Sequence, residues 1–485
     1  MKTAEKIAVV DIGSNSCRMV IYEQSGAALI PYFNEKTMAG LGRELSETGR
    51  LSPAGAELAL QTFHRFRAIT ASLKIKNVRA VATAAVREAV DGPDFKRRAE
   101  EILGAPIQVL SGADEGRLSA LGVSIGFIKP DGLIADLGGT SMELRPVEPD
   151  AVGESFLLGP LARSMDSGLS YEKRRKTMRK ILADSAFVDK VSGQDLFAVG
   201  GAWRNVAAVH MMLRDYPLRV AHAYKMSQAD IENVIEASAL AQSDKLTREQ
   251  LLGVSKRRFE TLPHAALLLK TLMEQLNVEK VTISSFGLRD GVAADGLDVD
   301  GASGLLDAVP LFLRSTPESR VFGRELYSFI HPISKQFKKS ETLLRAICSM
   351  ADAGGRMHPD HRAQLVYEQV LRAPVPSMSH SERLFAAYAA ASRYTFKLVE
   401  DPRYARLLGL GAKRRAKVLG TAMRLGSVYS GRSGTILATA KLAMKDSVLT
   451  LTVDKNYSDL VSETVERRLS QLAGLMQLQP RLIIA

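Results

Sequence analysis

The sequence predicts an α/β protein followed by a largely helical part, and three observations lead to this fold class. Over the first 300 residues, short apolar runs typical of strands alternate with longer amphipathic stretches typical of helices. One strand-and-loop motif occurs twice, with an offset of 125 residues between its two aspartates. Beyond about residue 300, the strand pattern stops and helical periodicity takes over.

The elements of the first part follow from local signals. An apolar run at 7–10 predicts a buried strand, and the run at 19–22 predicts its partner after a turn. Ser52 before Pro53 is a helix-start signal, so we expect a helix from 53 to about 73. The elements that follow are a strand at 78–83, a helix at 95–103, a strand at 106–110 and a helix that begins after Ser111.

The repeated motif marks two strand ends. The run Asp11-Ile12-Gly13-Ser14-Asn15-Ser16 is echoed by Asp136-Leu137-Gly138-Gly139-Thr140-Ser141, and each run follows an apolar strand. A repeat this long predicts two similar α/β lobes that face each other across a cleft, and such clefts are where ligands bind.

The last third of the chain divides into two expected parts. Helical periodicity covers 321–429, and weaker strand and helix signals at 435–442, 448–453, 458–472 and 482–484 predict a small α+β module. We therefore expect four domains, namely the lobes 1–124 and 125–300, an all-α domain 301–430 and the C-terminal module 431–485.

Composition indicates an ordinary globular protein. The 485 residues are 46% hydrophobic and 24% charged, and the length suggests roughly three domains. The apolar run before Asp11 is too short for a signal sequence, and no apolar stretch approaches a membrane span. Cys17 and Cys348 give neither a disulfide framework nor a metal-ligand spacing. We expect a cytoplasmic protein with no integral membrane association.

The net charge of +12 is unevenly distributed. Residues 1–300 hold 38 basic and 38 acidic side chains, whereas residues 301–485 hold 27 and 15. This asymmetry favours a polyanionic partner near the C-terminal part. A basic surface that only confers solubility explains the charge equally well.

Three glycine-containing loops predict an anion site. Loops of this kind aim successive backbone N–H groups at one point, where no Cβ intervenes. The third loop, Gly200-Gly201, follows a predicted strand at 197–199 and opens a helix, whose N-terminus would add to the site. The candidate phosphate-binding residues are Gly13, Ser14, Asn15, Ser16, Gly138, Gly139, Thr140, Ser141, Gly200 and Gly201.

Carboxylates accompany these loops. Asp136 ends its strand and Glu143 lies seven residues on, so both suit Mg²⁺ or Mn²⁺ bridging to phosphate oxygens. A turn-forming role is the alternative for Asp136. Asp114 and Glu115 lie in the first turn of the helix after Ser111, where acidic residues complement the helix dipole. Glu115 would act as a base only if it faced the cleft, and the residues alone favour the dipole role.

The motifs together resemble the exopolyphosphatase and guanosine pentaphosphate phosphohydrolase family of the sugar kinase, heat-shock ATPase and actin superfamily. The matching stretches, in the order the family has them, are 11–16, 82–87, 111–122, 136–143, 199–201 and 286–291. The resemblance implies two ribonuclease-H-like lobes facing across a cleft, then an all-α domain resembling His-Asp phosphohydrolases and the small α+β module.

The resemblance also assigns roles. Glu115 falls on the catalytic glutamate of the family, which reverses the interpretation from the residues alone. Asp136 and Glu143 fall on the carboxylates that help to hold the metal, and Arg87 falls on a contact to the phosphate chain. The phosphate loops fall on Gly13 to Ser16 and Gly138 to Ser141.

Three departures from the family pattern bear on these roles. The second loop lacks a third glycine and a hydroxyl, and the third loop continues with Ala202-Trp203 in place of the usual Thr. In the helical domain, Ala351-Asp352 stands where a His-Glu pair is typical. His358 and His361 remain but do not complete a ligand set, so we expect no second catalytic site there.

The leading hypothesis is an exopolyphosphatase that acts as a homodimer on inorganic polyphosphate and recognises no specific nucleic acid. The close alternative is hydrolysis of guanosine pentaphosphate to the tetraphosphate. The charge excess favours the long polymer, because a nucleotide needs few cationic contacts. A catalytically weak polyanion- or alarmone-binding regulator is an alternative of another class, and the retained carboxylates argue against it. A sugar kinase is disfavoured because the motifs follow the phosphatases.

Overall fold

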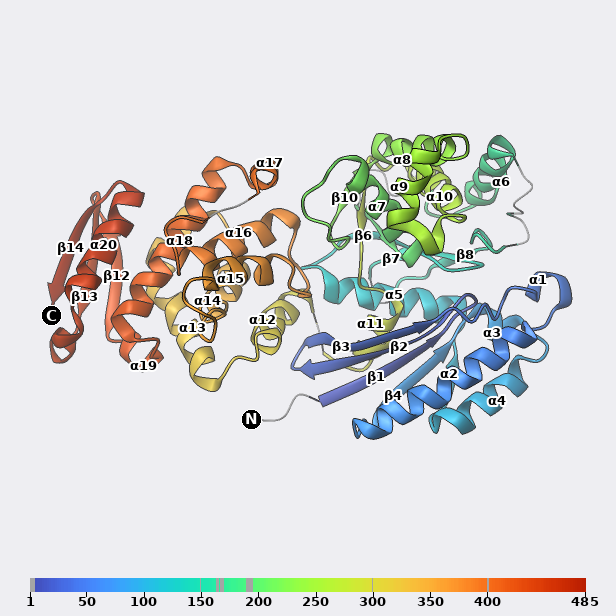
Figure 1. Cartoon of the computed structure of the whole chain (residues 1–485), viewed down its shortest axis with the longest axis horizontal. Helices are drawn as coiled ribbons and strands as arrows, with labels where there is room; N and C mark the ends of the chain where they lie inside the picture. Colours follow the sequence, from blue (N-terminus) through green and yellow to red (C-terminus); the bar gives the residue numbers. More distant parts are fainter. Residues whose placement is uncertain are drawn as a thin grey trace. The chain divides into compact units, whose positions relative to one another are not determined.

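The computed structural model describes residues 5–148, 150–162, 165, 170–188, 195–298, 300–398 and 401–485. Residues 1–4, which precede the apolar run before Asp11, lie outside this set. The chain separates into two compact units, Met1–Gly301 and Ala302–Ala485. The α/β class of the first unit and the helical character of the second confirm the predicted fold (Figure 1).

The first sheet has five strands in the order β3-β2-β1-β4-β5. Strand β1 is central and buried on both faces from Ile7 to Val10, which is why its apolar residues do not alternate with polar ones. It pairs antiparallel with β2 and parallel with β4. The strands are β1 (Glu5–Ile12), β2 (Cys17–Ser25), β3 (Ala28–Thr37), β4 (Asn77–Ala82) and β5 (Ile107–Val109).

Helices α2 (Pro53–Ser72) and α4 (Gly92–Leu103) cover one face of this sheet through a core that includes Phe63, Phe66 and Phe95. The short helices α1 (Leu45–Thr48) and α3 (Ala84–Glu88) lie in the connections. Helix α2 begins where the Ser52-Pro53 signal predicts. The Ser52 hydroxyl does not cap the helix, however, because it donates to Glu44 Oε1 at 2.8 Å.

The second sheet repeats the topology of the first. Its order is β10-β11-β9-β6-β7-β8, so β6 pairs antiparallel with β7 and parallel with β9, as β1 pairs with β2 and β4. The strands are β6 (Gly132–Leu137), β7 (Met142–Pro146), β8 (Glu154–Phe156), β9 (Asp195–Val199), β10 (Lys225–Ser227) and β11 (Lys280–Ile283). The helices of this lobe are α6 (Tyr171–Ala183), α7 (Gly201–Leu213), α8 (Gln228–Leu240), α9 (Lys245–Ser255), the 3₁₀ turn η2 (Lys256–Arg258) and α10 (Leu262–Gln275).

Helices α5 (Gly112–Gly126) and α11 (Leu288–Ala294) pack against each other where the two lobes meet (Figure 1). One face of α5 joins a core with β1 and α11, and another joins a core with β6 and β9. The crossing requires glycine. A Cβ on Gly291 would lie 1.8 Å from the Leu118 carbonyl oxygen, and one on Gly122 would lie 2.2 Å from the Gly287 carbonyl oxygen. Helix α5 therefore links the two lobes and carries Glu115 in its first turn.

The second unit consists of a helical part and a small sheet. Its helices are α12 (Gly301–Phe312), α13 (Pro317–Ile330), η3 (His331–Phe337), α14 (Glu341–Ser349), α15 (Arg362–Leu371), α16 (His380–Ser392), η4 (Pro402–Tyr404), α17 (Ala405–Leu408), α18 (Leu410–Ser430) and α19 (Gly434–Leu437). The sheet has the order β12-β13-β14, from β12 (Ala440–Lys445), β13 (Val448–Val453) and β14 (Gln479–Ile484), with η5 (Lys455–Leu460) and α20 (Glu463–Met476) between the last two. In the part of the chain that the structure describes, we find no helix that combines the length and apolarity of a membrane span.

Candidate active site

The strand register gives the two aspartates equivalent positions. Asp11 lies at the end of β1 opposite Arg18 of β2, and Asp136 lies at the end of β6 opposite Glu143 of β7. Directly opposed residues share a face of the sheet. The same place in the repeat therefore holds an acid and a base in the first lobe, and two acids in the second.

The two glycine loops have the same backbone closure. Gly13 N–H donates to the Ser16 carbonyl at 3.1 Å, and Gly138 N–H donates to the Ser141 carbonyl at 2.9 Å. The loops also face each other closely, since a Cβ on Gly139 would lie 3.3 Å from Ser14 Cβ. Two cradles of backbone N–H groups thus meet from opposite lobes, as the repeat predicts.

The third loop adds a helix N-terminus. Gly200 precedes α7 with φ of 111°, a left-handed conformation that favours glycine. A Cβ at this position would also lie 2.6 Å from the Leu137 carbonyl oxygen. The start of α7 therefore lies against the second glycine loop, where its free N–H groups favour an anion.

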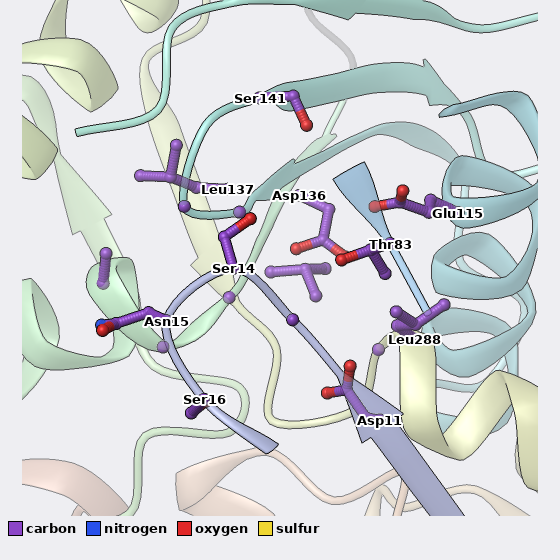
Figure 2. A pocket seen from close by; sticks show the side chains of 18 of the residues that line it. Asp11, Ser14, Asn15, Ser16, Thr83, Glu115, Asp136, Leu137, Ser141 and Leu288 are labelled. Carbon is purple, nitrogen blue, oxygen red and sulfur yellow. The ribbon is translucent and has the colours of Figure 1, made fainter. Parts of the chain in front are cut away.

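A cavity of about 220 Å³ joins these elements. Figure 2 shows Asp11, Glu115 and Asp136 directed into it from β1, α5 and β6. The predicted site residues that line the cavity are Gly13, Ser14, Asn15, Ser16, Glu115, Asp136, Gly138, Gly139, Thr140, Ser141, Glu143, Gly200 and Gly201. Of the predicted set, all of which the structure describes, Arg87 alone is not part of the lining.

Glu115 is held in the first turn of α5 by two sets of contacts. Ser111 and Asp114 form a capping box, which fixes this turn of the helix. Arg87 donates from Nη1 to Glu115 Oε1 at 2.7 Å and to the Leu110 carbonyl at 2.6 Å. Burial raises the pKa of Glu115 to about 7, and the hydrogen bond and charge of Arg87 oppose that rise. The dipole role is thus taken by Asp114, while Glu115 faces the cavity.

Asp136 and Glu143 form the acidic side of the cavity. Ser119 donates its hydroxyl to Asp136, and Ser141 donates its hydroxyl to Glu143 Oε1 at 2.6 Å. Burial raises the pKa of Asp136, and burial together with the negative charge of Glu115 raises the pKa of Glu143 to about 8. Asp136 and Glu143 are therefore crowded together, and the positive charges of Arg289 and Arg204 offset the effect of burial on Asp136 only in part.

The donor set fits a magnesium-type ion. Asp136 and Glu143 offer hard carboxylate oxygens from adjacent strands, and a divalent cation would relieve their crowding. Over the ranges that the structure covers, no group of three or more acidic, histidine or cysteine side chains is placed to hold a metal alone. The remaining ligands would have to be water and substrate oxygens, which is the usual coordination of Mg²⁺.

Basic side chains form the other side of the cavity, and the motif analysis did not identify them. These are Arg18, Lys36, Arg204, Arg258 and Arg289. Burial and the surrounding arginines lower the pKa of Lys36 to about 8, and burial lowers the pKa of Arg204 to about 10. Arg289 donates to Asp11 Oδ2 at 2.8 Å. Cations that lie close together and largely out of water attract anions strongly, so this lining suits a phosphate group.

Two of these cations had a signal in the sequence. Arg18 follows Asp11 by seven residues, as Glu143 follows Asp136, so the repeat itself marks Arg18. Arg289 belongs to one of the motif stretches. Lys36, Arg204 and Arg258 lie in β3, α7 and η2 and carry no motif, so only the folded chain brings them to the cavity.

The departure at the third loop has a structural explanation. Trp203 is fully buried and donates from Nε1 to the Ala265 carbonyl at 3.0 Å, so it packs into the core of the lobe. Ala202 lines the cavity without offering a polar side chain. The third loop therefore contributes backbone N–H groups only. In the second loop, Thr140 lines the cavity while its carbonyl accepts from Gly159 N–H at 2.9 Å.

Comparison with known proteins places the chain among phosphatases. The model of the Ppx/GppA phosphatase family matches residues 19–299, and the model of the C-terminal part of exopolyphosphatase matches residues 332–483. A relative from Aeromonas salmonicida, named guanosine-5'-triphosphate,3'-diphosphate pyrophosphatase, is 24% identical and covers 95% of this chain and 94% of its own.

Solved structures agree on the fold of the first unit. The crystal structure of an exopolyphosphatase from Cytophaga hutchinsonii superimposes with a TM-score of 0.53 at 21% identity, over 61% of this chain and 100% of that one. The Ppx/GppA family member of Aquifex aeolicus superimposes with a TM-score of 0.52 at 23% identity, over 60% of this chain and 97% of that one.

Proposed function

Because the chain belongs to the Ppx/GppA phosphatase family, we propose that it is an exopolyphosphatase that removes the terminal phosphate of inorganic polyphosphate. One observation carries the choice of substrate. Five basic side chains line the cavity, whereas no aromatic side chain does so among the described residues. Such a surface suits a chain of phosphates better than a nucleobase, which usually stacks on an aromatic ring.

The chemistry needs a base beside a phosphate cradle, and the cavity has both. Arg87 occupies Glu115 Oε1, so Oε2 accepts the proton of the attacking water. The water oxygen bonds to the terminal phosphorus as the bond from that phosphorus to the bridging oxygen breaks. The departing chain keeps the bridging oxygen and its electron pair. The N–H groups of the two glycine loops and the start of α7 stabilise the charge on the transferred phosphate.

The remaining residues position the substrate. The arginines and Lys36 bind the phosphates that follow the terminal one, which holds the chain in line for attack. Asp136 and Glu143 would hold Mg²⁺ or Mn²⁺. When bound, this ion supplies charge neutralisation to the phosphate oxygens.

The role of Glu115 predicts a clear kinetic result. Glu115→Gln should lower kcat by ~10² to 10⁴, because general-base assistance is typically of this size. Substrate binding should stay nearly unchanged, since the amide keeps the shape of the carboxylate. The measurement is phosphate release, with binding followed separately by calorimetry. The control is Glu101→Gln, which removes an exposed carboxylate of α4 and should leave turnover intact. Equal turnover in Glu115→Gln and the parent protein rejects the assignment.

The metal role of Asp136 has its own test. Asp136→Asn should raise the Mg²⁺ concentration needed for half-maximal activity, because one anionic ligand is lost. The control is Asp131→Asn, which changes an exposed aspartate just before β6. If the metal titration of Asp136→Asn overlays that of the parent protein, Asp136 acts only as the turn residue that Ser119 holds.

A second candidate substrate is guanosine pentaphosphate, because the Aeromonas relatives that match along nearly the whole chain carry the name of a guanosine pentaphosphate-hydrolysing enzyme. The same base and cradles would serve that reaction. The cytoplasmic location and the homodimer stay predictions.

A further inference from the structure

The second unit contains a cavity of about 360 Å³ that no motif identified. It opens among the ends of α15, α16 and α18, the turn before α15, and α20. Its lining is dominated by arginine, and the lining residues are Gly355, Arg362, Arg393, Tyr394, Arg424, Ser427, Val428, Gly431, Arg432 and Arg468.

The charges around this cavity are poorly balanced. Asp352 is the acidic group that faces the arginines, and it binds Arg432 at 2.9 Å and lies 3.9 Å from Arg393. The other oxygen of Asp352 accepts a hydrogen bond from Ser319 at 2.9 Å. Five guanidinium groups thus line the cavity, and Asp352 contacts two of them. The pKa of Arg424 is lowered by burial and by the positive charge of Arg468, Arg362 and Arg393.

Several donors in the cavity lack partners. Among the residues that the structure describes, Arg424 makes no hydrogen bond or ion pair, and the buried Nε of Arg468 has no acceptor. The hydrogen bond that Arg468 does make among the described residues runs from Nη1 to Gln471 Oε1 at 2.6 Å. A buried donor without an acceptor costs roughly 1–3 kcal/mol of stability. An anion in the cavity would supply the missing acceptors.

Helix dipoles do not explain the cluster. Cations are stabilised at the last turn of a helix, which accounts for Arg393 directly after α16 but not for Arg424, because the last turn of α18 contains no basic residue. Arg362, however, is the first residue of α15, where a positive charge is disfavoured, and Arg468 lies within α20. These two arginines have no local reason to face the others.

The shape of the cavity favours phosphate over a base. Tyr394 is the aromatic lining residue, and its ring already lies beneath the guanidinium groups of Arg393 at 4.4 Å and Arg362 at 5.0 Å. Its hydroxyl is held by the Ala351 carbonyl and Gly354 N–H. The ring therefore fixes the two arginines. Guanidinium forks match phosphate oxygens in pairs, and an excess of four positive charges calls for a ligand with several negative ones.

We propose that this cavity binds an oligophosphate group through Arg362, Arg393, Arg424, Arg432 and Arg468. None of these residues lines the cavity of the first unit. The ligand is either inorganic polyphosphate or the phosphate part of a nucleotide. Asp352 orients Arg432 and Arg393 toward it. The site binds without hydrolysing, because its only carboxylate among the described residues is already engaged by two arginines and a serine.

The test is equilibrium binding of tripolyphosphate to the full chain, measured by calorimetry in EDTA and about 50 mM salt, where phosphate contacts are strong. All proteins carry Glu115→Gln so that turnover does not disturb the titration. We expect two sites per chain. Adding Arg424→Gln and Arg468→Gln should weaken one site by about tenfold or more and leave the other unchanged. Arg424→Lys with Arg468→Lys should give an intermediate loss, because the charge remains but the fork does not.

The matched control neutralises two exposed lysines of β12, Lys441→Gln and Lys445→Gln, with the same change in net charge. It should keep both sites. The Arg424→Gln, Arg468→Gln protein should melt no lower than its parent, since the change relieves like-charge repulsion, so a folding defect does not mimic the result. This binding readout is independent of the reaction proposed for the first unit.

A second titration with GTP distinguishes the ligand sources. Equal affinity for GTP and tripolyphosphate at the arginine cavity indicates that only the phosphates are recognised, and a preference for tripolyphosphate indicates the inorganic chain. A single site in the parent, two unchanged sites in the Arg424→Gln, Arg468→Gln protein, or a site that takes GTP but not tripolyphosphate each overturns the proposal.

Discussion

Glu115 shares its carboxylate with the Arg87 guanidinium, and this pair sets the protonation of the base. In the proposed reaction Glu115 must be deprotonated to accept a proton from water, so we expect the rate to rise with pH through its pKa of about 7. Burial keeps that pKa high and Arg87 draws it down. Arg87 is thus placed to position the base, and the resemblance assigns it a contact to the phosphate chain.

Arg87→Gln separates these two roles. If Arg87 acts through Glu115, its loss raises the pKa of Glu115 further, and the rising limb of kcat/KM against pH moves to higher pH. The measurement is a pH profile of phosphate release at fixed ionic strength. If the variant has a higher KM but the rising limb of its kcat/KM profile stays at the same pH, Arg87 contacts only the phosphate chain. That result contradicts a role of Arg87 in positioning Glu115. Glu88→Gln is the control, because Glu88 lies 3.5 Å from Arg87 on its exposed side.

The residues of the candidate site differ in how far the sequence could predict them. Gly13 to Ser16, Gly138 to Ser141 and Asp136 follow from the repeat, because the motif sits at equivalent strand ends. Glu115 needed the family resemblance, since an acid in a first helical turn has a sufficient local explanation. Lys36, Arg204 and Arg258 were beyond prediction, because their meeting depends on how β3, α7 and η2 are folded together.

At the scale of elements, the crossing of α5 and α11 fixes the helix that carries Glu115 between the two lobes. Gly291→Ala would place a Cβ 1.8 Å from the Leu118 carbonyl oxygen, so the helices must separate. We expect a loss of about 1–3 kcal/mol in the free energy of unfolding, as overpacking typically costs. The urea midpoint measures this loss. Activity should fall as well, because α5 carries Glu115.

Gly253→Ala is the matched control for that change. Gly253 lies in α9, and among the described residues no group beyond its neighbours and the backbone of that helix lies within 4 Å of the position that an added Cβ would take. Alanine there should therefore stabilise the helix by about 0.5–1 kcal/mol. A Gly291→Ala protein that unfolds at the same urea concentration as the parent would contradict the close crossing.

Long elements were predictable, whereas the edge strands β8 and β10 were not, although the three-residue edge strand β5 lies within the strand predicted at 106–110. Helix α2 and strands β1, β2 and β4 appear where periodicity and the Ser52-Pro53 signal place them. Strands β8 and β10 have three residues each, too few for a pattern, and exist because they pair with β7 and β11. Pairing, and not propensity, defines such strands.

For the whole molecule, the structure shows where part of the basic excess after residue 300 lies, because five arginines of the second unit surround one cavity. Four of these basic residues, Lys413, Arg414, Arg415 and Lys417, lie close together on α18. Two of them pack on aromatic rings, since Lys413 lies over Tyr388 at 5.2 Å and Lys417 over Phe396 at 3.7 Å. The arginines that surround a cavity are instead scattered along the sequence. The uneven charge therefore favoured a polyanionic partner, but it directed attention to Lys413, Arg414, Arg415 and Lys417 and not to the arginines of the cavity.

The central claim is that the first unit hydrolyses inorganic polyphosphate in preference to guanosine pentaphosphate, and one measurement tests it most directly. The full chain is assayed for phosphate release from long-chain polyphosphate and from guanosine pentaphosphate, with Mg²⁺ and after its removal by EDTA. The account predicts Mg²⁺-dependent release from both, with kcat/KM for polyphosphate higher by about tenfold or more. A higher kcat/KM for guanosine pentaphosphate, or no release from polyphosphate, would contradict it.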